Sequence, residues 1–150
     1  MFDFIWHLRG SVPLGGISSN ERILDSVERL LVRQRKGVSE RGTDFLAFDE
    51  PLWSNLVGSN WLAMVTYDRG RFWVKQSLGG RRLRYDLRSL HLMVFCLFVA
   101  FMASLFGLAG EGLLGGLKIG VGAFGWLYGM NFLLALVRIP STVRKAVTRA

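Results

Sequence analysis

Two long apolar stretches follow one another in the second half of the sequence. The first covers 18 consecutive residues without a charge, from Leu92 to Ala109, LMVFCLFVAFMASLFGLA. A helix of that length rises about 27 Å, close to the ~30 Å hydrocarbon core of a bilayer. The second runs from Leu113 to Val137 and is interrupted only by Lys118 and Asn131. Two such runs in tandem predict a transmembrane helical hairpin rather than buried helices of a soluble protein.

Charge and apolar residues occupy different parts of the 150-residue chain. Hydrophobic residues make up 51% and charged residues 20%, with a net charge of +8, and these values conflict in a uniform globule. Of the 19 Lys and Arg, 14 lie within residues 1–88, as do ten of the 11 acids. We therefore expect an N-terminal domain over 1–88, a hairpin over 89–138 with spans at about 90–109 and 113–137, and a basic tail over 139–150.

A glycine motif lies between the two stretches. The segment Gly110-Glu111-Gly112-Leu113-Leu114-Gly115 matches G-x-G-x-x-G, a dinucleotide-binding pattern. That site needs a strand before the glycines and an acid about 20 residues after them. Here a membrane-length run precedes the glycines and no Asp or Glu follows Glu111. We interpret Gly110-Glu111-Gly112 as a tight turn in which glycine takes a positive φ.

The distribution of basic residues predicts the orientation. Basic residues precede the first span and follow the second, whereas the turn between the spans carries only Glu111. The positive-inside rule therefore places both termini in the cytoplasm, for a protein of a bacterial-type inner membrane. The start, MFDFIWHLRG, lacks the basic leader of a signal peptide, so the first span is expected to act as its own insertion signal.

The N-terminal domain has mixed periodicity. Residues 18–36 have helical spacing, with Ser18 and Glu21 as a capping box and Gly37 placed to end the helix. The segments 43–49, 61–68, 71–77 and 81–90 are short, aromatic and β-branched, which is typical of strands. The fold class we expect is an α+β cytoplasmic cap, one amphipathic helix on a small antiparallel sheet, followed by an all-α two-helix transmembrane hairpin.

Basic residues at both ends of the hairpin are candidate contacts for anionic lipids or for an acidic partner. Lipid attraction is worth about 1 kcal/mol per residue near the surface. Nucleic acid is a weaker alternative, because no recognition helix or RNA motif is found. The candidates are Arg81, Arg82, Arg84, Arg88, Arg138, Arg144 and Lys145.

Residues suited to catalysis or metal binding are sparse. His7 and His91 have no Cys or acid at ligand spacing, and Cys96 is most simply an apolar packing residue. His91 could ligate a haem or chlorin metal, but an interfacial histidine that bonds headgroups or backbone is commoner. Lys118 can snorkel to the outer interface, and the chain supplies no acid within the membrane to pair with it. We predict no enzyme activity, no metal and no cofactor.

Small residues on both spans predict close helix packing. At 100° per residue, Gly112, Gly116 and Gly120 share one face of the second helix, and Gly115, Gly122, Gly125 and Gly129 fall roughly opposite. In the first span the small residues are Ala100, Ala103, Ser104 and Gly107. One glycine face can pack on these, which leaves the other spare. Glycine is also simply frequent in membrane helices, and that is the competing explanation.

These observations favour a non-enzymatic accessory or scaffold subunit. It would pack against a larger integral-membrane complex, such as a respiratory or photosynthetic one, through the spare glycine face and the basic cap. The alternative is a homo-oligomeric channel or transporter component lined by Lys118 and Asn131. An enzyme acting on lipid comes third, because no catalytic arrangement supports it.

Overall fold

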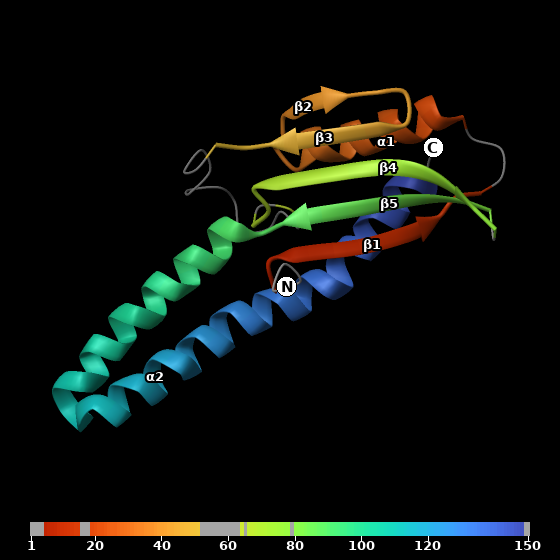
Figure 1. Ribbon diagram of the computed structural model, residues 1–150. Helices are drawn as coiled ribbons and strands as arrows, with labels where there is room; N and C mark the ends of the chain where they lie inside the picture. Colours follow the sequence, from red (N-terminus) through yellow and green to blue (C-terminus); the bar gives the residue numbers. More distant parts are fainter. Residues whose placement is uncertain (1–4, 16–18, 52–63, 65, 79, 149–150) are drawn as a thin grey trace.

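The computed structural model describes residues 5–15, 19–51, 64, 66–78 and 80–148 (Figure 1). A five-stranded sheet and a short helix precede one long helix that reverses direction. In chain order the elements are β1 His7–Pro13, α1 Asn20–Arg33, β2 Val38–Arg41, β3 Phe45–Asp49, β4 Arg69–Ser77, β5 Gly80–Arg88 and α2 Leu90–Thr148.

The sheet is antiparallel throughout, with strand order β1-β5-β4-β3-β2. The expected antiparallel sheet is therefore present, and β3, β4 and β5 lie where three of the four strands were predicted. Strands β1 and β2 were not predicted. Of the strand expected over 61–68, residues 61–63 and 65 lie outside the described part. Met64 and Thr66 lie in turns and Asp68 in a bend instead.

Helix α1 is shorter than the predicted span of 18–36. Its N-cap is Ser19, whose Oγ accepts a hydrogen bond from Arg22 N at 3.3 Å. The predicted cap, Ser18, lies outside the described residues. The helix ends before Gly37, the residue expected to end it, and the left-handed position is taken by Arg35 at φ 57°. There Lys36 N donates to Leu31 O at 2.9 Å, which satisfies a carbonyl of the last turn.

One face of the sheet is covered by α1 and by the C-terminal part of α2, which lie side by side (Figure 1). Alternate residues of the strands point into this core, including Phe48, Phe72 and Leu83, all fully buried. Ile139 and Val143 of α2 are also fully buried in the same cluster. The segment expected as a basic tail over 139–150 is therefore helical as far as Thr148. We call the sheet, α1 and this end of α2 the sheet domain.

Helix α2 consists of two antiparallel arms that meet at Gly112. Gly112 has φ 75°, in the left-handed region that favours glycine, while Gly110 remains helical. The first arm is Leu90–Gly110 and the second is Gly112–Thr148, with mean hydropathies of 2.5 and 1.5 over their most apolar windows. By length and composition, both arms could cross a membrane. Only 17% and 11% of those windows is buried, so neither arm is an ordinary core helix.

Candidate interaction surfaces

Small residues let the backbones of the two arms approach each other closely. A Cβ built at Gly116 would lie 2.6 Å from the Ser104 carbonyl oxygen, and one at Gly107 would lie 2.9 Å from Gly116 Cα. A Cβ at Gly120 would collide with the Ser104 hydroxyl and lie 3.0 Å from the Ala100 carbonyl oxygen. Such distances are shorter than real Cβ contacts, so only glycine fits this seam.

Three glycines of the second arm face away from the first. A Cβ placed at Gly122, Gly125 or Gly129 meets no atom of the described residues within 4 Å. Of the other residues singled out for helix packing, Gly112 lies at the turn with open space around it and Ala103 is half-buried. Gly115, which its helical spacing grouped with Gly122, Gly125 and Gly129, is buried. The structure thus separates a glycine seam between the arms from an open glycine face.

Two aromatic residues near the middle of the second arm, Tyr128 and Trp126, have opposite surroundings. Tyr128 is buried, its hydroxyl donates to Ile5 O at 2.5 Å, and its ring stacks on Phe124 at 5.4 Å between centroids. Trp126 is 69% exposed and lies about 40° around the helix from Gly122. Tyr128 therefore ties the second arm to the segment before β1, whereas Trp126 borders the open glycine face.

The sheet face opposite the core is open and rich in charge. Cross-strand neighbours on it include Arg9 and Asp86, whose Nε and Oδ2 are 2.9 Å apart. His7 Nδ1 lies 2.5 Å from the other oxygen of Asp86. Arg69 forms an ion pair with Asp49, and this hydrogen bond raises the pKa of the Arg69 guanidinium. Acids thus offset part of the basic charge of this face.

The junction between the sheet and the first arm contains a fully buried carboxylate. Asp68 accepts hydrogen bonds from Arg88 Nε at 2.8 Å and from Leu90 N, the first residue of α2, at 2.8 Å. A carboxylate at a helix N-terminus is stabilised by the unpaired N–H groups there. Arg88, a predicted lipid or partner contact, is therefore engaged by Asp68 within the protein. The protonated phenols of Tyr67 and Tyr85 lie in the adjoining core, where burial raises the pKa of each.

The remaining predicted basic contacts are distributed over two surfaces. Arg82 and Arg84 are exposed on the open sheet face, and Arg81 donates to Asn20. Arg138, Arg144 and Lys145 are exposed on the second arm beyond its most apolar part. The structure does not bring all seven residues into one patch.

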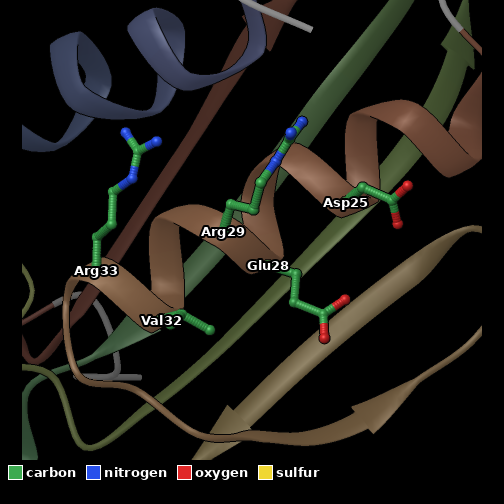
Figure 2. Close-up of a pocket in the computed structure, with 5 residues that line it drawn as sticks. All are labelled: Asp25, Glu28, Arg29, Val32 and Arg33. Atoms are coloured by element: carbon green, nitrogen blue, oxygen red, sulfur yellow. The ribbon is translucent and has the colours of Figure 1, made fainter.

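A shallow hollow on the outer surface of α1 carries no site. Figure 2 shows that its lining side chains fan out from the helix instead of converging on one point. The carboxylates of Asp25 and Glu28 already bind Arg41 of β2. Hydrogen bonding to Asp25 is the main reason that the pKa of Arg41 is raised. These contacts secure the outer hairpin of the sheet to α1.

No group of three His, Cys, Asp or Glu side chains that could hold a metal ion occurs among the residues that the structure describes. His91 is half-buried near the start of the first arm, and Cys96 is buried in that arm. No family model, curated protein or solved structure matches this chain.

Proposed function

We propose that this chain is a non-enzymatic accessory or scaffold subunit of a larger integral-membrane complex, of respiratory or photosynthetic type. Its two arms form a transmembrane hairpin, and the sheet domain is a cytoplasmic cap. Large apolar side chains on both arms are exposed, among them Phe98, Phe106 and Leu113, at 61%, 77% and 77%. Lipid or a partner helix would remove this surface from water.

The open glycine face is the observation that carries the proposal. Glycine in a helix costs about 1 kcal/mol relative to alanine. At Gly116 and Gly120 close contact with the first arm offsets that cost, but at Gly122, Gly125 and Gly129 no contact with the described part of the chain does so. A neighbouring helix backbone could approach this face closely, which is how glycine stripes drive association in bilayers.

Gly125→Leu tests the role of this face. The added side chain should push a partner helix away, while insertion survives because Leu favours the bilayer centre by about 0.5 kcal/mol. We expect a correctly inserted protein that no longer co-purifies with foreign subunits in mild detergent. Leu134→Phe, at a 51% exposed position about 180° around the helix from Gly125, is the control and should keep its partners.

Two results would contradict the proposal. If Gly125→Leu keeps the same co-purifying subunits as the unaltered chain, the open glycine face contacts lipid only. If native-size analysis shows a ladder of self-multiples and no foreign subunit, the chain is a homo-oligomer. The glycine stripe would then serve self-association.

The orientation follows from charge. Apart from Lys118, the exposed basic residues of the described part lie with the sheet domain, at the opposite end of the arms from Gly112 (Figure 1). The positive-inside rule then places the sheet domain in the cytoplasm and the turn outside. In a Cys96→Ala background, Gly110→Cys should react with an impermeant thiol reagent added outside, and Ser141→Cys should not. The reverse pattern would invert the proposed topology.

No observation favours a channel lined by Lys118 and Asn131. The two positions are 13 residues apart, which separates them by about 140° around the second arm. The amide of Asn131 donates to Leu127 O of its own helix at 2.7 Å. One pore could not be lined by both residues unless subunits contributed different faces.

A further inference from the structure

The open face of the sheet is arranged in cross-strand rows at increasing distance from the start of α2. The proximal rows contain Arg69 opposite Arg88, and Arg71 opposite Asp86. The distal rows contain Trp73 opposite Arg84, and Lys75 opposite Arg82. At about 3.3 Å per residue along β5, Arg82 lies roughly 20 Å from Arg88, where the chain enters the first arm.

Basic residues of the proximal rows are largely paired with acids. Arg69 pairs with Asp49, and Arg88 with the buried Asp68. Asp86 binds both Arg9 and His7 from the neighbouring strand. The part of the face nearest the proposed bilayer is therefore close to neutral, although anionic headgroups would lie on that side.

The distal rows are not compensated in this way. Lys75, Arg82 and Arg84 are exposed, and no hydrogen bond or ion pair joins their side chains to another residue in the described part of the chain. Lys75 and Arg82 are direct cross-strand neighbours, an arrangement of like charges that destabilises a sheet. A bound anion would remove this repulsion.

Trp73 lies among these cations. It is half-buried, with Phe45 opposite it on β3 and Arg84 opposite it on β5. The guanidinium of Arg71 lies 4.5 Å from the centre of the Phe45 ring and covers it. Trp73 is therefore the principal uncovered aromatic of this surface. Tryptophan and arginine are the residue types most enriched at the centres of protein interfaces.

We propose that the distal rows, Trp73, Lys75, Arg82 and Arg84, dock an acidic segment of a protein subunit. Carboxylates of that segment pair with the two arginines, whose planar groups bind carboxylate in a bidentate manner, and an apolar side chain packs on Trp73. This inference rests on the proposed subunit role and specifies the chemistry of a partner on the cytoplasmic side. Three cations would neutralise few phosphates, and Arg71 covers the second aromatic ring, so nucleic acid fits less well.

The test uses the full chain in nanodiscs of zwitterionic phosphatidylcholine. The probe is a fluorescein-labelled peptide in which Glu and Ser alternate around one Leu, and its dissociation constant is measured by fluorescence anisotropy. The double variant Arg82→Glu/Arg84→Glu should bind the peptide at least about tenfold more weakly. The control is Arg144→Glu/Lys145→Glu, which changes the net charge equally at exposed positions on α2 and should bind within about twofold of the unaltered chain.

Further variants make the outcomes decisive. Arg82→Gln/Arg84→Gln removes the charges without adding acids, and it should weaken binding severalfold while the near-ultraviolet circular dichroism stays unchanged. Equal weakening by the α2 control would show that only net charge matters and would overturn the inference. Tighter binding of oligouridylate than of the peptide would assign the face to nucleic acid. Loss of peptide binding in phosphatidylglycerol nanodiscs would assign it to lipid headgroups.

The two proposals fail separately. Gly125→Leu lies in the second arm and should bind the peptide as the unaltered chain does, even when it has lost its membrane partners. If the peptide does not bind and Gly125→Leu still loses its partners, the docking surface is wrong and the subunit role stands.

Discussion

The second arm of α2 passes through two different environments along one helix. Near the turn its large apolar side chains are exposed, with Leu113 at 77% and Leu117 at 61%. Beyond Val137, which is 73% exposed, the next apolar positions Ile139 and Val143 are fully buried under the sheet. The residue types are the same in both parts. The sheet covers the apolar side chains of one part and leaves those of the other exposed. The exposed part needs lipid or a partner to cover its apolar side chains.

The largest expected effect distinguishes the two parts by burial. Ile139→Ala should lower the free energy of unfolding of the sheet domain by about 2–5 kcal/mol, because it removes a fully buried side chain and leaves a cavity. Leu117→Ala, in the exposed part, should change it by less than about 0.5 kcal/mol. Urea unfolding of the full chain in mild detergent, followed by near-ultraviolet circular dichroism, measures both. Equal losses would mean that the two parts do not differ as described.

A smaller effect should separate the two faces of the exposed part. Gly116→Ala places a Cβ against the Ser104 carbonyl, so the arms must move apart at a cost of about 1–3 kcal/mol. Gly122→Ala meets open space and should not destabilise the pair of arms. The comparison is made by titration with SDS, recording the detergent fraction at which the arms separate. A Gly122 variant as unstable as the Gly116 variant would place the open glycine face inside the protein.

The smallest expected effect is confined to the sheet domain. Arg35→Gly should raise its stability by about 0.5–1 kcal/mol, since Arg35 pays for a left-handed conformation that glycine adopts without strain. Gly37→Ala is the matched control and should be close to neutral, because Gly37 has no positive φ and open space beside it. The urea midpoint should shift while the SDS transition of the arms does not. A shift in both transitions would show that the two parts unfold together.

Patterns with strong periodicity were predicted well. The strand expected within 81–90 is present as β5, in which Leu83, Tyr85 and Leu87 are buried and alternate with less buried charged residues. The two apolar helices and the positive φ at the turn glycine Gly112 are also present. These features are local, because each depends on residues within a few positions of one another.

Features that depend on long-range packing were missed. Strand β1 has its buried residues Leu8 and Val12 in alternation, but Gly10 and Pro13 reduce its strand propensity. A side chain at Gly10 would collide with the Tyr85 ring, a reason for glycine that only the paired sheet reveals. In the predicted tail, Ile139 and Val143 have helical spacing, which was a usable signal. The surrounding basic residues and Pro140 obscured it.

The candidate surfaces were predictable only in part. Helical spacing indicated which glycines share a face, although it could not show that Gly115 is buried or that Gly122 faces open space. The basic residues could be counted from the sequence. The ion pairs that they form could not be predicted from the sequence. Asp86, for example, is brought to His7 and Arg9 by the pairing of β1 with β5, which are far apart in the sequence.

The burial of Ile139 and Val143 in the sheet domain has a consequence for biogenesis. A ribosome makes about 5–20 residues per second, so for several seconds after β5 is complete the domain lacks the side chains that close its core. In the proposed transmembrane hairpin, those side chains arrive only after the chain has crossed the membrane and returned. A hairpin whose second arm fails to return would leave the sheet with an exposed apolar face, open to proteases and chaperones. In the proposed topology, maturation of the sheet domain would therefore report that insertion has succeeded.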